Sequence, residues 1–137
     1  MRLIAILLMS LGLVGCTSSA QGPEEMATAQ IQTISAASPA TYKTVDLKAW
    51  RNPYLIVKTD RIGLLDVSNS EEHLIKIEEL PAKLAQLPAS AWPYGRVVAL
   101  ADDRAPAADQ VHIRENKAKI AATLRSLNID IQWVPSS

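Results

Sequence analysis

The fold is decided by the stretch Arg96-Val97-Val98-Ala99-Leu100-Ala101, which two aspartates, Asp102 and Asp103, follow directly. An unbroken apolar run of this length is typical of an interior strand whose two faces are both covered. The aspartates end the strand at its carboxyl edge. We therefore take residues 96–101 as the central strand and interpret the rest of the chain outward from it.

The segment after the central strand predicts a long helix and a final strand. A helix over about Asp109–Leu127 has an apolar stripe at helical spacing, made by Ile113, Ile120, Leu124 and Leu127. Asn128 can adopt the left-handed conformation that ends a helix. From Ile129 to Val134 apolar and polar residues alternate, as in a strand with one buried face.

The segment before the central strand predicts two or three strands and a short helix. Tyr54–Thr59 is aliphatic and β-branched, and a turn at Asp60–Gly63, with Gly63 left-handed, leads to a second strand over Leu64–Val67. A shorter third strand is possible at His73–Ile77. Glu78 and Glu79 then open a short helix, whose apolar face is Leu80, Leu84 and Leu87 and which ends at Pro88.

Together these elements predict an α+β domain over residues 45–137, in the order β-β-(β)-α-β-α-β. A sheet of this size needs at least one covered face. We therefore expect a small mixed β-sheet with two helices on one face.

Residues 1–15 have the layout of a secretory signal sequence. Arg2 supplies a short basic region, and the apolar stretch that follows is shorter than the roughly 20 residues needed to span a bilayer. The stretch ends in Leu13-Val14-Gly15-Cys16, which resembles the lipobox of bacterial lipoproteins. The alternatives are an ordinary signal sequence or an uncleaved anchor with an incidental cysteine.

The resemblance to bacterial lipoproteins implies cleavage before Cys16, a diacylglycerol thioether on its sulfur, and usually acylation of the new α-amine, as with palmitate. Two or more acyl chains hold a protein firmly on its membrane, whereas one binds only marginally. Thr17 stands where an aspartate would retain an enterobacterial lipoprotein at the inner membrane. The resemblance therefore implies the periplasmic face of the outer membrane.

Residues 16–44 are expected to form a flexible, lipid-anchored tether with a span of about 30 Å. They are rich in Ser, Thr, Ala and Gln and contain no hydrophobic run that could close a core by itself. The alternative is a weak helix that begins at Pro23 and places Ala27, Ile31 and Ile34 at helical spacing.

Composition excludes several classes of function. The 14 basic and 14 acidic residues balance, so no charge excess indicates a nucleic-acid partner. The single cysteine cannot form an internal disulfide, and with two histidines it cannot build a cysteine-rich zinc site. The sequence also lacks the patterns of nucleophile elbows, zinc proteases and nucleotide-binding loops. We expect no enzyme, no metal and no cofactor.

A few polar side chains remain as candidates for chemistry. His73 and His112 could act as acid and base with Asp66 or Asp102, but their separation gives no spacing signal, and structural or surface histidines are the plainer interpretation. Asp102 and Asp103 could bind a ligand at the end of a strand. They could equally stabilise the start of the helix that follows.

The aromatic residues offer a second kind of candidate. Trp92 and Tyr94 lie on one loop, where they could present a contact surface for a glycan or a protein. In a chain with no Phe, Trp92 could instead fill the end of the core. Trp50 poses a similar choice, because it could cap the edge of the sheet or lie at the contact point of the tether.

The order of elements also resembles a known family. An aliphatic strand ending in Asp, and a final helix running into Leu127-Asn128-Ile129, resemble the periplasmic domain of the ExbD/TolR biopolymer-transport proteins. Those proteins keep a transmembrane helix with an acidic residue used in proton coupling, whereas no Asp or Glu precedes Glu24 here. The resemblance thus implies a fold and no motor-coupling role.

From the sequence we expect a lipoprotein of the bacterial cell envelope that is held on its membrane through Cys16 and binds or scaffolds a protein without enzymatic activity. Its contact surface would be the edge of the sheet or the loop with Trp92 and Tyr94. The alternative is a small ligand-binding or enzymatic domain that uses Asp102, Asp103 and a histidine.

Overall fold

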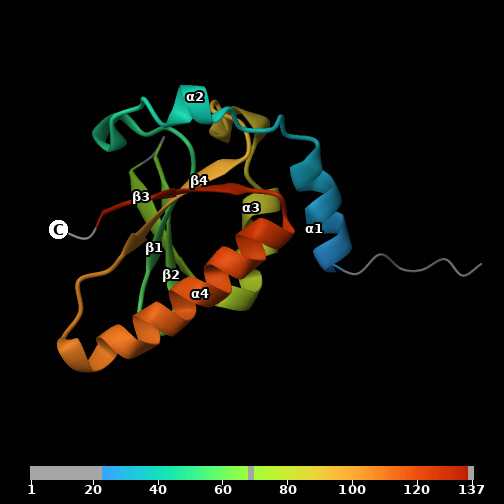
Figure 1. The fold of residues 1–137 in the computed structure, drawn as a ribbon. Helices are drawn as coiled ribbons and strands as arrows, with labels where there is room; N and C mark the ends of the chain where they lie inside the picture. The colour runs from blue at the N-terminus through green and yellow to red at the C-terminus, as the bar shows by residue number, and fades with distance from the viewer. Residues whose placement is uncertain (1–22, 68–69, 136–137) are drawn as a thin grey trace, which may run out of the picture.

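A computed structural model describes residues 23–67 and 70–135 of the chain (Figure 1). The signal sequence predicted for residues 1–15 and the lipobox at Cys16 lie outside the described residues. The described chain has the α+β fold that the sequence predicts.

The centre of the fold is a five-stranded mixed sheet with the strand order β3-β2-β1-β4-β5. The strands are β1 (Tyr54–Val57), β2 (Ile62–Asp66), β3 (Glu71–Ile75), β4 (Val97–Asp102) and β5 (Asp130–Trp133). Strand β2 pairs antiparallel with β1 and β3, whereas β4 pairs parallel with β1 and β5. The third strand, which the sequence left open, is present but spans Glu71–Ile75 and not His73–Ile77, and the predicted order of strands and helices from residue 54 onward is confirmed.

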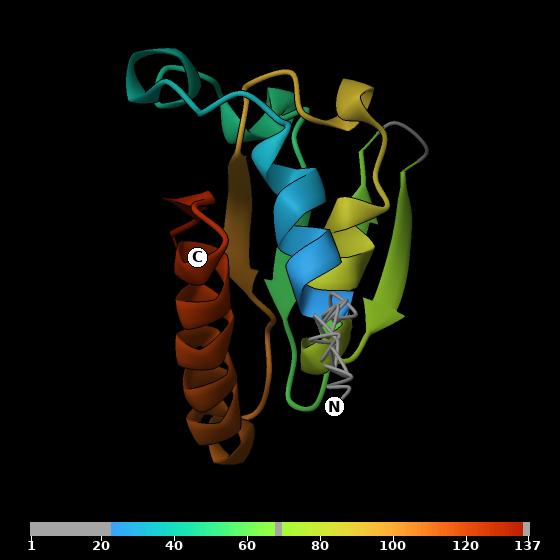
Figure 2. The same ribbon diagram turned by 90° about the vertical axis from the view of Figure 1, so that its right-hand side faces the viewer.

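Helices cover one face of the sheet. Within the described residues the α-helices are α1 (Pro23–Gln32), α2 (Pro39–Tyr42), α3 (Leu80–Ala85) and α4 (Gln110–Ser126), of which the short α2 packs through Tyr42 on the opposite face. Figures 1 and 2 show α3 and α4 on the same face, with α1 packed against α3. The expected pair of helices on one face is confirmed, and α1 adds to this layer. None of the helices in the described part of the chain is long and apolar enough to cross a membrane.

The central strand β4 is buried on both faces, as its apolar run predicts. Val98 and Leu100 are fully buried in the main core beneath the helices, whereas Val97 and Ala99 are fully buried on the opposite face. Side chains alternate between the two faces of a strand, so one run of apolar residues supplies both layers.

Residues 23–44 belong to the folded domain, and the interpretation of residues 16–44 as a flexible tether is wrong for this part. Ala27 and Ile31 of α1 are 4% and 0% exposed. The Gln32 side chain donates a hydrogen bond to the carbonyl of Leu127 at 2.7 Å. The alternative of a helix from Pro23 is confirmed. The polar residues of α1 lie on its solvent-facing side, because only one narrow apolar stripe of the helix contacts the core.

The chain that follows α1 also forms hydrogen bonds with the rest of the domain. The carbonyls of Ile34 and Ser35 accept hydrogen bonds from the guanidinium and the backbone N–H of Arg96, at 3.0 and 2.9 Å. Gly95 has a φ of 83°, and a Cβ there would lie 2.8 Å from the carbonyl oxygens of Ser35 and Ala36. Residues 23–44 are therefore part of the folded domain, which does not begin at residue 45.

Trp50 packs on the second face of the sheet and does not cap an edge; it contacts Tyr42, which lies in the segment predicted to be the tether, so the predicted contact is present although that segment is folded. Its ring lies 6.5 Å from that of Tyr42 and 5.0 Å from that of Tyr94, and its indole N–H donates to the carbonyl of Pro53 at 3.2 Å. This cluster covers Val97 and is separate from the main core.

The hairpin between β1 and β2 differs from its prediction. The N–H of Lys58 donates to the carbonyl of Arg61 at 2.9 Å, so Thr59 and Asp60 are the central residues of the turn. Gly63 lies inside β2 and is not left-handed. Its position near a turn suggested a left-handed glycine. Gly63 instead leaves space for the side chain of Glu72 on the neighbouring strand.

Candidate functional site

The loop with the two aromatic residues does not present them to solvent. Trp92 is only 4% exposed and belongs to the main core, as the interpretation of Trp92 as core filler predicts. Tyr94 is half-buried against Trp50, and its hydroxyl donates to the carbonyl of Ala49 at 3.3 Å. Neither ring therefore forms an exposed contact surface.

Asn52 holds this loop and was not identified from the sequence. Its side chain is fully buried and donates to the carbonyls of Gly95 and Val97 at 2.7 and 2.8 Å. Its oxygen accepts a hydrogen bond from the N–H of Tyr94 at 2.9 Å. An isolated asparagine before a proline has no spacing signal, so only the fold reveals this role.

Asp102 and Asp103 lie at the end of β4, as predicted, but on opposite faces of the sheet. The Asp102 carboxylate lies 3.1 Å from Nζ of Lys117 on α4, and the same ammonium lies 5.2 Å from the ring centroid of Trp133. The Asp103 carboxylate lies 3.6 Å from Nζ of Lys58. Each aspartate thus faces a lysine, and the two are not brought together in one site.

Lys58 is shared between two acids on the face opposite the helices. Its Nζ lies 3.1 Å from the carboxylate of Glu72 on β3 as well as 3.6 Å from that of Asp103. The hydrogen bond to Glu72 raises the pKa of Lys58 above its ordinary value, and the charge of Asp103 acts in the same direction. Glu72 can cross β2 because Gly63 has no side chain, since a Cβ at Gly63 would overlap Oε1 of Glu72.

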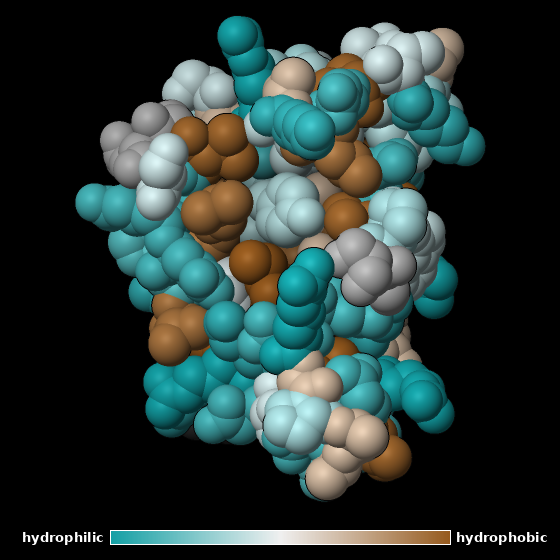
Figure 3. All heavy atoms as spheres, turned by 90° about the vertical axis from the view of Figure 1, so that its left-hand side faces the viewer, coloured by the Kyte–Doolittle hydropathy of each residue, from teal (hydrophilic) through white to brown (hydrophobic). Residues whose placement is uncertain are grey.

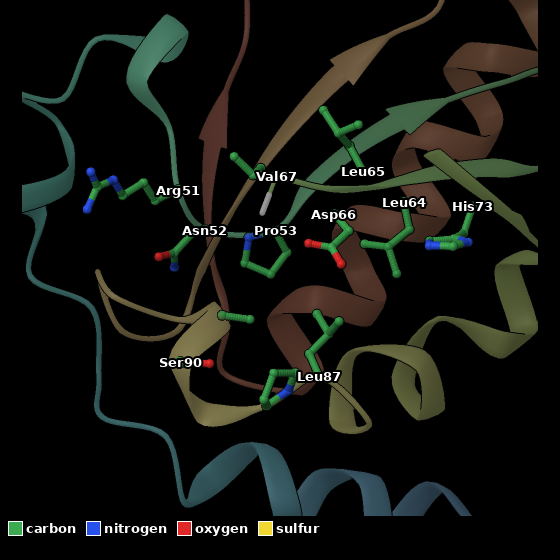
Figure 4. A pocket seen from close by; sticks show the side chains of 12 residues that line it. Arg51, Asn52, Pro53, Leu64, Leu65, Asp66, Val67, His73, Leu87 and Ser90 are labelled. Carbon is green, nitrogen blue, oxygen red and sulfur yellow. The ribbon is translucent and has the colours of Figure 1, made fainter. Parts of the chain in front are cut away.

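The histidines lie apart from Asp102 and Asp103. His112 is exposed on α4. His73 is exposed on β3, and its Nε2 lies 3.7 Å from the carboxylate of Glu71. His73 and Asp66 both line a hollow of about 180 Å³ between the sheet and the loop that follows α3 (Figure 4). The structure therefore brings Asp66 and His73 to one hollow, without Asp102, Asp103 or His112 among the residues that line it.

A larger groove runs between β3 and α3. It has a volume of about 710 Å³ and is lined by Leu74 and Ile75 on one side and Lys83, Gln86 and Leu87 on the other. We call it the β3 groove. The hollow that contains Asp66 adjoins it, because both are lined by His73, Leu64 and Leu87. Sequence reasoning did not identify this groove, since it depends on the position of β3 in the sheet.

The β3 groove lies beside an open edge of the sheet. Strand β3 is the end strand of the sheet, and four of its five residues are exposed. Leu74 on this strand is 56% exposed, which is unusual for a large apolar side chain on a sheet.

Figure 3 shows the face opposite α1 and α3, where apolar side chains gather near the centre and hydrophilic ones surround them. Ile56 of β1 and Leu65 of β2, two apolar residues of this sheet, are only half-buried.

No group of three or more histidine, cysteine, aspartate or glutamate side chains that could hold a metal ion is found within residues 23–67 and 70–135. Comparison of the chain with protein-family models, with curated proteins and with solved structures gives no match.

Proposed function

We propose that this protein is a lipid-anchored module of the bacterial cell envelope that binds another protein along the β3 groove and is not an enzyme. The observation that carries the proposal is the exposed end strand β3 beside a groove of about 710 Å³. An open strand edge next to a helix is a surface on which proteins bind extended segments of their partners.

The membrane anchor in this proposal is Cys16. Its support is the lipobox pattern Leu13-Val14-Gly15-Cys16, with Thr17 in the position that favours the outer membrane. Only residues 17–22 separate Cys16 from the start of α1. A chain of this length cannot extend further than about 25 Å. A lipidated Cys16 would therefore hold the domain at the membrane surface, where the partner must also lie.

Binding accounts for the geometry better than a catalytic site does. Asp102 and Asp103 each lie beside a lysine on opposite faces of the sheet, so the alternative of a ligand or catalytic site that combines them with a histidine has no support in the geometry. The β3 groove, in contrast, combines the apolar side chains Leu74 and Leu87 with polar ones at its rim. Such a surface suits a polypeptide.

The proposal is tested by photo-crosslinking in intact bacteria that express the full chain. A photoreactive amino acid is placed at Gln86, in the β3 groove, and at Lys119 or Ala122, which are exposed on α4. We expect a discrete crosslinked protein from Gln86 and none from the α4 positions. Equal crosslinking from both surfaces, or crosslinking from α4 alone, would contradict the proposal.

The anchor is tested separately in the same cells. Replacement of Cys16→Ser should abolish labelling of the protein by a radioactive or clickable fatty acid, because the thiol is the site of alkylation. A fatty-acid label that persists in the variant would contradict lipidation at Cys16.

A further inference from the structure

We propose that the partner contributes an extended, basic segment with apolar residues at alternate positions, and that this segment adds to β3 as a sixth strand. The inference rests on the proposed function and specifies how the β3 groove is occupied. Four features of the β3 edge favour such a partner: the direction of its outward backbone groups, its unbroken pairing with β2, the lining of the groove, and the local charge.

The free backbone groups follow from the register of the sheet. The hydrogen bond from Lys58 N–H to Arg61 closes the turn, and bonded pairs alternate along an antiparallel ladder. In β2 the backbone N–H and C=O groups of Gly63 therefore point to β1. The backbone N–H and C=O groups of Leu64 point to His73 of β3. On β3 the N–H and C=O groups of Glu72 and Leu74 consequently point away from the sheet, toward the open edge.

Apart from the charges of Glu71 and Glu72, this edge lacks the protection that exposed strands normally carry. Natural edge strands are blocked by prolines, bulges or inward-pointing charges, and lysine is common on them. Strand β3 has no proline or lysine and pairs with β2 in an unbroken register of five residues. The charged end of Glu72 is held over the sheet by Lys58, away from the edge. The outward groups of Glu72 and Leu74 are therefore accessible to another strand.

The groove would receive every second side chain of the added strand. His73 and Ile75 lie on the helical face of β3, and the groove beside them is lined by Leu87 of the loop after α3. The intervening side chains would lie next to Leu74 on the other face, where it is 56% exposed. Apolar residues at alternate positions of the added strand would therefore all face the groove on the helical side.

The charge around the groove favours a basic segment. Residues 71–87 contain four glutamates and two lysines, and because Glu72 is paired with Lys58, three glutamates remain against the two lysines. Glu79 lines the groove itself, and Glu71 is exposed on the edge strand. A second copy of this chain fits less well, because its β3 carries two glutamates and no lysine or arginine that could pair with the glutamates of this edge. The structure therefore points to a different protein as the partner.

The experiment uses the full lipidated chain, purified from membranes in detergent, as bait for a phage-displayed library of short random peptides. Leu74→Pro removes the outward N–H of residue 74 and leaves the ladder with β2 intact, since proline is tolerated where the N–H faces solvent. Leu74→Thr is the matched control, because it also removes the leucine side chain but keeps the N–H group.

We expect the selected peptides to alternate apolar residues with lysine or arginine. Their affinity should fall by about tenfold or more for Leu74→Pro relative to Leu74→Thr. Peptides that bind Leu74→Pro and Leu74→Thr equally well, acidic peptides, or a selection that enriches nothing would each overturn the inference. The proposed function would survive that result if Gln86 still crosslinks to a protein in cells, so the two failures are distinguishable.

A charge-reversal variant keeps the inference testable if Leu74→Pro does not fold. Glu79→Lys at the groove should weaken binding of the selected peptides, whereas Glu115→Lys on the exposed side of α4 should leave it unchanged. Equal effects of the two reversals would overturn the inference, because they would show a response to net charge alone.

Discussion

The carboxylate of Glu72 on β3 lies 3.1 Å from the ammonium of Lys58, just beyond the end of β1, although β2 separates the two strands. The contact is possible because Gly63 of β2 leaves space for the Glu72 side chain. One consequence is local, because a lysine at the end of the hairpin is fixed between two acids. The other concerns binding, because the same contact holds the charge of Glu72 away from the open edge of the sheet.

The first prediction concerns the space at Gly63. Gly63→Ala should displace the Glu72 carboxylate and break its contact with Lys58, at a cost of about 0.2–1 kcal/mol for an ion pair that is still partly exposed to solvent. In a Glu72→Ala background the same Gly63→Ala change should be neutral or slightly stabilising, because alanine lowers the entropy of the unfolded chain. Urea denaturation of the four proteins in this double-mutant cycle measures the difference. Strictly additive effects would show that Gly63 and Glu72 do not interact.

The second prediction concerns alkaline pH. The pKa of Lys58 is raised, first by its hydrogen bond to Glu72, and the pKa values of Tyr42 and Tyr54 are raised, first by burial. In each case the folded protein retains a proton that the unfolded chain releases, so stability is complete below a pH of about 10 and falls as the pH rises further.

Denaturation midpoints at increasing pH check this alkaline loss of stability. Lys58→Met should show a smaller decline than the wild-type protein, because only the contributions of Tyr42 and Tyr54 remain. A wild-type midpoint that stays constant or rises across the same range would contradict the prediction.

The third prediction concerns the N-terminal helix. Ile31→Ala should lower the free energy of unfolding by about 2–5 kcal/mol, because it removes a fully buried side chain and leaves a cavity. Met26→Ala on the same helix should change it by less than about 0.5 kcal/mol, because Met26 is 61% exposed. Urea denaturation of the protein expressed from Thr17 onward distinguishes the two. Similar, small effects at both positions would show that α1 does not pack in the core and would contradict the prediction.

The fourth prediction concerns Asn52. Asn52→Ala should destabilise the protein by at least about 2 kcal/mol, since it leaves the N–H of Tyr94 and two buried carbonyls without their partner. Asn52→Asp should be worse, because a buried carboxylate would face the carbonyl oxygens of Gly95 and Val97. Thermal unfolding, followed by the near-ultraviolet signal of the tryptophans, measures both variants. Asn52→Asp with wild-type stability would contradict the assigned bonding.

The periodic parts of the fold could be predicted from the sequence because their signals are local. The apolar run of β4 and the apolar stripe of α4 each lie within one continuous segment. The left-handed conformation of Asn128, at a φ of 56°, was likewise predictable from its residue type at the end of a helix. These features need no knowledge of distant partners.

The remaining features depend on contacts between distant segments. Ile31 is buried in a core built from distant segments of the chain, such as Leu84 of α3, whereas its own neighbourhood is polar and indicated a tether. Gly63 is explained by Glu72 on the adjacent strand, and Asn52 by the loop before β4. The β3 groove could not be predicted, because it exists only where the strand order places β3 at an edge beside α3.

The central claim is that a membrane-anchored chain captures its partner at the open edge of β3. It is tested most directly by the yield of the crosslink from Gln86 in intact cells, compared between Leu74→Pro and Leu74→Thr with Cys16 intact. The account predicts that the crosslinked product persists in Leu74→Thr and is lost in Leu74→Pro at equal protein levels. Equal yields from the two variants would contradict it.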